Sequence, residues 1–263
     1  MTASPIRSHG TLVTSDKEQI SYCLYCQGHA SVIVVVHGFY NSKEAVLLQE
    51  LAAHLSPFHD VFMFDFRGHG KSSGLFHWMS KEERDLDAAL DFVQARYARV
   101  AVIAFSLGAS ICINALSRQR AGIASLVAVS PPSEFRKIDY HVWALSLKDD
   151  VAYTLFTRDG RVGKGFRPGP FWLKKKRPID SVRHLTVPVL YIHGDKDWVV
   201  RPWHSQALFE KTRTHKRLVM IEGGPHAEYL LKNHAEQFLS EVNAWLEETF
   251  DTTRGTRSGD GNN

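Results

Sequence analysis

The chain has 263 residues, of which 44% are hydrophobic and 23% are charged, a composition typical of a globular domain of ordinary solubility. Its net charge of +4 gives no reason to expect a nucleic-acid-binding protein, and three cysteines are too few for a disulfide framework. No apolar run reaches the length of a membrane span, and the first residues lack the apolar core of a signal peptide. We therefore expect a cytoplasmic protein without integral membrane association, and the sequence leaves its oligomeric state open.

Short apolar runs alternate with helical patterns in the first half of the chain. Residues 10–26 predict two strands joined by a polar turn, and four apolar runs then predict buried strands at 31–36, 60–65, 100–105 and 125–130. Helical patterns lie between them at 43–56, 80–97 and 107–119. Ser80 and Glu83 match a capping box, which predicts the start of the second helix. Continuous Val and Ile runs indicate a mostly parallel sheet covered by helices on both faces.

The alternation stops after Pro132 and resumes at residue 187. Residues 133–186 mix aromatics, glycines and cations, so we expect a cap inserted between two parts of one core, 1–132 and 187–250. The second part predicts strands at 187–194 and 216–224, a helix from about 203, and a helix over about 226–250. Residues 251–263 are polar and glycine-rich, so we expect a disordered tail. The strands add up to a sheet of about eight, with an antiparallel hairpin at its start.

Polar residues follow the predicted strands at the points where ligands bind in parallel sheets, outside the carboxyl ends. The strands are followed in turn by His37 to Tyr40, by Asp65, by Ser106, by Asp195 and Asp197, and by His226. A serine, carboxylates and a histidine are therefore expected at one edge of the sheet. The chain order of serine, aspartate and histidine is the order found in α/β-hydrolases.

Five motifs in sequence order carry a resemblance to a known family. They are H-G-F at 37–39, D-F-R-G-H-G-K-S at 65–72, A-F-S-L-G at 104–108, G-D-K-D at 194–197 and G-G-P-H at 223–226. From about residue 10 to 250 the chain resembles the α/β-hydrolase serine hydrolases, near small-capped carboxylesterases, monoacylglycerol lipases and serine aminopeptidase-like enzymes. One departure is Ala104, which stands where the elbow motif G-x-S-x-G has its first glycine. The resemblance implies an α/β-hydrolase fold.

The resemblance also implies a catalytic triad. Ser106 is the expected nucleophile, although a serine at the start of a helix is also a common N-cap. His226 is the expected general base, against the alternative of a surface histidine. The family pattern G-x-x-D selects Asp197 as the acid, which leaves Asp195 as a turn carboxylate. Asp65 is a further candidate, for which we favour a structural role in its own loop.

The expected reaction is hydrolysis of a small-molecule carboxylic ester with a small to medium acyl chain, through an acyl-enzyme. The backbone N–H groups of Phe39 and Leu107 would form the oxyanion hole. Thioesterase, amidase or peptidase, and C–C bond hydrolase activities remain open, as does a binding protein without catalysis. We expect no cofactor and no metal, because the histidines lack zinc-like spacing and the Cys23-x-x-Cys26 pair has no second pair.

Cations and aromatics are concentrated in residues 158–177, which contain eight basic residues and one acidic residue, Asp159. This segment carries a net charge of +7, which leaves −3 for the rest of the chain. Three interpretations remain open: a solvated basic face, a cap that attracts anionic esters, or a surface that docks on anionic lipid. In the cap interpretation, Phe171 and Trp172 line the substrate pocket together with Tyr40.

Overall fold

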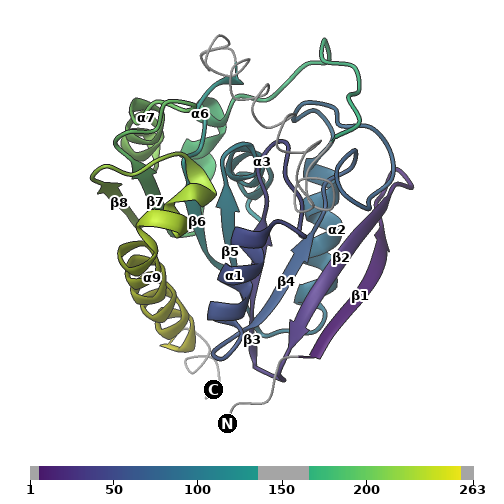
Figure 1. Cartoon of the computed structure of the whole chain (residues 1–263), viewed down its shortest axis with the longest axis horizontal. Coiled ribbons are helices and arrows are strands. Elements are labelled where there is room, and N and C mark those ends of the chain that lie inside the picture. Colours follow the sequence, from purple (N-terminus) through teal and green to yellow (C-terminus); the bar gives the residue numbers. More distant parts are fainter. Residues whose placement is uncertain (1–5, 136–165, 256–263) are drawn as a thin grey trace, which may run out of the picture.

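A computed structural model describes residues 6–135 and 166–255 of the chain. Its centre is one eight-stranded sheet with the strand order β1-β2-β4-β3-β5-β6-β7-β8 (Figure 1). The strands are β1 (Ile6–Val13), β2 (Gln19–Cys26), β3 (Ser31–Val36), β4 (Asp60–Phe64), β5 (Arg99–Phe105), β6 (Ile123–Val129), β7 (Val189–Gly194) and β8 (Lys216–Ile221). β2 pairs antiparallel with both β1 and β4, and all other neighbours are parallel. The predicted fold class, a mostly parallel sheet with an antiparallel N-terminal hairpin, is confirmed.

Helices cover both faces of this sheet. They are α1 (Val46–Leu55), α2 (Glu83–Gln94), α3 (Leu107–Leu116), α6 (Pro178–Ser181), α7 (Trp203–Lys211), α8 (Leu230–Asn233) and α9 (Ala235–Gly255), with 3₁₀ turns η2 (Val182–His184) and η3 (Ala227–Tyr229). Val34 and Val36 of β3 pack in one buried cluster with α2 and α3. Val35 packs in the other cluster, with α1, α8 and α9. This alternation explains the continuous apolar runs, because each strand must bury both of its faces.

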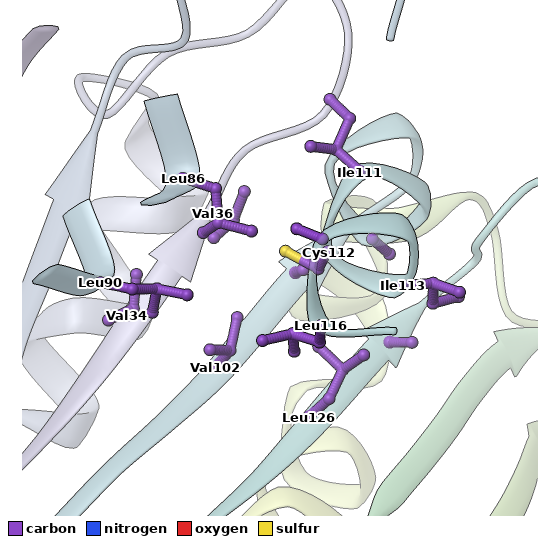
Figure 2. Packing of buried hydrophobic residues seen from close by; sticks show 14 of the residues in the cluster. Val34, Val36, Leu86, Leu90, Val102, Ile111, Cys112, Ile113, Leu116 and Leu126 are labelled. Atoms are coloured by element: carbon purple, nitrogen blue, oxygen red, sulfur yellow. The ribbon is translucent and has the colours of Figure 1, made fainter. Parts of the chain in front are cut away.

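The cluster beneath α3 positions the helix that begins at the elbow. Figure 2 shows Val36, Val102 and Leu126 of three neighbouring strands in the same cluster as Cys112 and Leu116 of α3. All five side chains are buried. Close packing of this kind holds α3 against β3, β5 and β6.

Two predicted helix boundaries were wrong. Ser80 and Glu83 do not form a capping box: α2 begins at Glu83, and its cap residue Glu82 makes no side-chain capping bond. The buried Glu82 carboxylate instead accepts hydrogen bonds from the backbone N–H groups of His77 and Lys81, which holds these residues in a turn.

The helix predicted over about 226–250 is divided into η3, α8 and α9. It is interrupted at His234, whose backbone leaves the helical region with φ −132°. α9 then continues to Gly255, inside the segment that we expected to be disordered.

The segment expected to be a cap is described only in part, because residues 136–165 lie outside the described residues. At its end, Ile179, Val182 and Leu185 pack in the same cluster as α3, so these residues belong to the core packing. Cys23, Cys26 and Cys112 are free thiols. In the described ranges, 6–135 and 166–255, we find no helix with the length and hydropathy that crossing a membrane requires.

Candidate active site

Ser106 lies at a sharp turn between β5 and α3. Its backbone adopts φ 49° and ψ −122°, a strained conformation for a residue with a side chain. The turn is held by a hydrogen bond from the Ser106 backbone N–H to the Val129 carbonyl (2.8 Å). The Ser106 side chain makes no capping bond to the helix, although Ser106 occupies the N-cap position. The alternative interpretation of Ser106 as a helix-capping side chain therefore has no support in the geometry.

Small residues allow the backbones to approach closely around this turn. A Cβ atom on Gly108 would lie 2.2 Å from the carbonyl oxygen of His37, a distance that no side chain tolerates. A Cβ on Gly38 would lie 3.2 Å from the Cβ of Ser106, which is also tight. Ala104 is fully buried in the cluster beneath α3, so its methyl group is accommodated by core packing. The glycine that the elbow requires is thus Gly108, and alanine fits at 104.

Ser106, His226 and Asp197 form a continuous chain of hydrogen bonds. The Oγ of Ser106 lies 2.9 Å from Nε2 of His226, and Nδ1 of His226 lies 2.7 Å from Oδ2 of Asp197. Ser106 follows β5, Asp197 follows β7 and His226 follows β8, so three strand ends place the three side chains together. Because Asp197 is an acceptor, His226 donates from Nδ1, which leaves Nε2 to accept the Ser106 proton.

Asp197 is buried, and its surroundings favour the charged carboxylate. Burial alone would raise its pKa, but the charge of His226 and hydrogen bonds from His193 and His226 outweigh burial and hold the pKa below the usual range. The backbone N–H groups of Val199 and Val200 also donate to Oδ1, at 3.0 and 2.8 Å. Asp197 is therefore both fixed in orientation and ionised.

A second histidine, His193, contacts the same carboxylate, and the sequence analysis did not identify it. His193 is fully buried at the end of β7, and its Nε2 lies 3.1 Å from Oδ2 of Asp197 and 2.8 Å from the carbonyl of Val200. Both partners are acceptors, so we assign the proton to Nε2. Nδ1 then accepts from the Ser205 hydroxyl (2.6 Å). A histidine in an otherwise apolar strand, just before G-x-x-D, was the available signal.

The other two carboxylates considered from the sequence lie elsewhere. Asp195 is exposed and accepts a hydrogen bond from the backbone N–H of Gly223 (2.7 Å), as expected for a turn residue. Asp65 is fully buried and bonds with Lys43, whose ammonium lies 2.5 Å from Oδ2 and whose N–H lies 2.8 Å from Oδ1. It also accepts from the N–H of Lys71 (2.8 Å), so it joins two loops as a structural residue. The sequence analysis missed the buried Lys43.

The predicted oxyanion residues and Ser106 border one pocket. This pocket has a volume of about 20 Å³ and is lined by Ser106, Phe39, Leu107, Pro132, Phe135, Val199 and Val200. Of the predicted substrate-pocket residues, Tyr40 is nearly buried and contacts Phe166 (ring centroids 5.7 Å apart). Phe171 and Trp172 are exposed and do not line this pocket.

Two further hydrogen bonds connect the loops that carry the site. Asn41, two residues after Phe39, donates from its amide to Oε1 of Glu228 (2.6 Å), two residues after His226. The backbone N–H of Ala227 donates to the Ser130 hydroxyl (3.1 Å). The loop of Phe39 and the loop of His226 are thereby held in fixed relation to each other.

Comparison with known proteins identifies the family to which this fold and site belong. The profile described as "Alpha/beta hydrolase family" matches residues 33–241, well over half of the chain. The chain belongs to the alpha/beta hydrolase family. Curated relatives are distant. "Uncharacterized protein YfhR" of Escherichia coli K12 is 25% identical over 189 residues, which covers 70% of this chain and 58% of that protein.

A second relative is "Alpha/beta hydrolase domain-containing protein 17B" of Xenopus laevis, 24% identical over 174 residues (64% of this chain, 50% of that protein). The chain thus spans between half and three-fifths of these relatives. Among solved structures, the Pyrococcus furiosus esterase Pf2001 superposes with a TM-score of 0.76 at 22% identity, covering 94% of this chain and 92% of that one. The esterase RhEst1 from Rhodococcus sp. ECU1013 gives 0.73 at 18%, covering 92% and 99%. At such identities the superpositions establish the fold.

Proposed function

We propose that the protein is a serine hydrolase that cleaves carboxylic esters of small to medium acyl chains. The observation that carries this proposal is the hydrogen-bonded chain of Ser106, His226 and Asp197, with Ser106 at a strained elbow. A polar cluster that only supports the fold would not require a serine with a strained backbone. The Ser106 side chain also does not cap the helix that it precedes. Strain of this kind is concentrated at functional sites.

In the proposed mechanism, Nε2 of His226 removes the proton from Ser106 as Oγ attacks the carbonyl carbon of the ester. The imidazolium then protonates the leaving alcohol, and an acyl-enzyme remains on Ser106. Water, deprotonated by His226, attacks the acyl-enzyme, and the acid and free Ser106 are formed. Asp197 stabilises the imidazolium in both halves and holds Nδ1 as a donor, while the hydrogen bonds that Asp197 accepts fix its position.

The oxyanion formed in each step needs donors that are in place before the reaction. We assign this role to the backbone N–H groups of Leu107 and Phe39, because both residues line the pocket that contains Ser106. Loss of one such donor costs about 3 kcal/mol of transition-state stabilisation. The lining of this pocket is largely apolar, which suits an acyl group.

Labelling with a fluorophosphonate probe tests the nucleophile. We expect the native protein to be labelled and Ser106→Ala to remain unlabelled, with Ser110→Ala as the control. Ser110 is a buried serine of α3, and its hydroxyl donates to the Pro132 carbonyl (2.6 Å). An unlabelled native protein, or equal labelling of Ser106→Ala, would refute the proposal, including the alternative activities that use the same serine.

The bond that is cleaved needs a separate experiment, because thioesterases, amidases and C–C bond hydrolases use the same three residues. A panel of p-nitrophenyl esters of increasing acyl length, acyl-CoA thioesters and aminoacyl amides would separate these classes. We expect the highest kcat/KM on short esters. A larger kcat/KM on a thioester or an amide would move the assignment to that class while the nucleophile stays the same.

A further inference from the structure

The end of β6 lies between the two strands that carry Ser106 and Asp197, because β6 is the neighbour of both β5 and β7 in the sheet. The Val129 carbonyl accepts from the backbone N–H of Ser106 (2.8 Å), and the N–H of the next residue, Ser130, donates to the carbonyl of Ile192 in β7 (2.8 Å). Ser130 is fully buried. Its backbone is therefore fixed between the elbow and β7, and its hydroxyl reaches a third element.

That third element is the loop that carries His226. The Ser130 hydroxyl accepts a hydrogen bond from the backbone N–H of Ala227 (3.1 Å), the residue directly after His226. Ala227 is fully buried, so its N–H group needs an acceptor inside the protein. One side chain thus connects the end of β6 to the residue that follows the proposed general base.

Both residues of this hydrogen bond have strained backbones. The φ angle is 48° at Ser130 and 47° at Ala227, in the left-handed region that favours glycine. Alanine has no polar side chain with which to stabilise this conformation locally, in contrast to asparagine or aspartate. The surrounding structure must therefore hold the bend at Ala227, and the Ser130 hydroxyl holds it at the N–H group.

His226 lies between this bend and a second anchor on the preceding side of its loop. The N–H of Lys196 donates to the carbonyl of Gly224 (3.0 Å), which ties the loop to the segment that carries Asp197. The backbone of His226 itself is extended, with φ −71° and ψ 132°, and it turns sharply at the next residue. The position of the imidazole beside Asp197 thus depends on anchors before and after it, and Ser130 provides the one adjacent to His226 in the chain.

We propose that Ser130 is a positioning residue for the general base, an inference that rests on the proposed role of His226. Its hydroxyl holds the N–H of Ala227 and thereby keeps Nε2 of His226 2.9 Å from the Oγ of Ser106. A displacement of about 1 Å can cost about 100-fold in rate, so a loosened bend should slow both proton transfers. Because Val129 holds the elbow and Ser130 holds the base loop, nucleophile and base are set relative to each other through the end of β6.

Ser130→Gly tests this proposal, because glycine accepts a φ of 48° without strain and the substitution removes only the hydroxymethyl group. We expect kcat on the best ester of the panel to fall about 10- to 100-fold, with KM within about twofold and a melting temperature close to native. Ser130→Ala, which removes the hydroxyl alone, should give the same fall in kcat.

A second measurement separates positioning of His226 from general support of the fold. In a His226→Ala background, Ser130→Gly should change the remaining kcat by less than about twofold, because the group on which Ser130 acts is gone. A merely structural role would lower the melting temperature and would reduce kcat equally in both backgrounds.

The matched control is Ser125→Ala. Ser125 lies in the same strand and is fully buried, and its hydroxyl bonds with that of Thr249 in α9 (2.9 Å), so kcat should stay within about twofold. Native kcat in both Ser130 variants overturns the inference and leaves the serine hydrolase assignment intact, as does an equal loss in the control or a full further loss in the His226→Ala background. A native protein that neither hydrolyses esters nor reacts with the fluorophosphonate probe refutes the proposed function, and this inference with it.

Discussion

Two fully buried carboxylates lie at the same sheet edge, Asp197 after β7 and Asp65 after β4. They pair with different kinds of side chain, Asp197 with a histidine and Asp65 with a lysine. Asp65 pairs with the ammonium of the buried Lys43, which lies 2.5 Å from its Oδ2. Asp197 faces His226, whose other nitrogen reaches Ser106 at the surface of the pocket. The difference teaches that burial of an acid does not reveal its role. What distinguishes the two is the partner: a lysine ammonium only donates, whereas the imidazole of a histidine has a second nitrogen that can accept a proton.

Ser106→Ala should give the largest loss of kcat among variants of the hydrogen-bonded chain that contains Asp197. Loss of the nucleophile is expected to lower kcat about 10⁶-fold, to the level that the oxyanion hole and binding alone support. The melting temperature should be nearly unchanged, because the Ser106 side chain makes no helix-capping bond. Steady-state kinetics with the best ester of the panel checks this, and substantial remaining turnover would mean that Ser106 is not the nucleophile.

Asp197→Asn should follow, with a loss of kcat of about 10⁴-fold. The amide cannot stabilise the imidazolium and allows the wrong tautomer of His226. Asp195→Asn is the matched control from the same loop, and its kcat should stay within about threefold, because Asp195 accepts only a turn hydrogen bond from Gly223 in the described structure. The reverse order of effects would transfer the acid role to Asp195.

Lys43→Met tests the other buried carboxylate, Asp65, and should change the stability of the protein. Removal of the ammonium leaves Asp65 buried without its counter-charge, which is expected to cost about 3–5 kcal/mol in the free energy of unfolding. Denaturant titration measures this loss, and the remaining folded protein should still react with the fluorophosphonate probe. Lys71→Met is the control: the Lys71 side chain is 67% exposed and its ammonium pairs with Glu44 at 3.5 Å, so a loss of about 1 kcal/mol or less is expected. Equal losses in both variants would contradict the assignment.

His193→Leu should have a smaller effect on catalysis, transmitted through Asp197. Loss of the donor from Nε2 frees the carboxylate to shift, which should lower kcat about 10- to 100-fold with KM nearly constant. His193→Gln keeps an N–H donor and should recover part of kcat. If both variants lower the melting temperature equally but keep the native kcat, His193 only supports the fold.

The smallest expected effect concerns how kcat/KM depends on pH. Because the pKa of Asp197 is held below its usual range, this carboxylate stays ionised from neutral pH down to below about pH 4. Its stabilising contribution is present above the unfolded-state pKa and is lost only as pH falls through the lower folded-state value. The acid limb of kcat/KM should therefore report a single ionisation, that of His226. A limb with the slope of two protons would show that Asp197 titrates with it.

The central sheet was predictable because a strand covered by helices on both faces buries all of its side chains, and such a strand is therefore a continuous apolar run in the sequence. Helix ends were less predictable. The Ser80 and Glu83 pattern was overruled by Glu82, which binds backbone N–H groups from inside the fold. Ser106, Asp197 and His226 were selected by motif order, and the structure brings them within hydrogen-bonding distance. Phe171 and Trp172 were expected beside them but lie exposed, in the stretch between Gly169 and Lys176, whose backbone groups bond to Phe76 and Asn114.

By itself the sequence determined the alternation of strands and helices, the edge at which the polar residues meet, and the small residues that the elbow requires. These follow from local rules, since apolar periodicity and glycine spacing act over a few neighbouring residues. Only the tertiary structure decided the partners of the buried charges. Lys43 meets Asp65 because the ends of different strands and loops are brought together, and this contact leaves no local pattern in the chain. His193 and Asp197 are only four residues apart, but their contact depends on how the loop after β7 folds, with the N–H groups of Val199 and Val200 donating to Asp197.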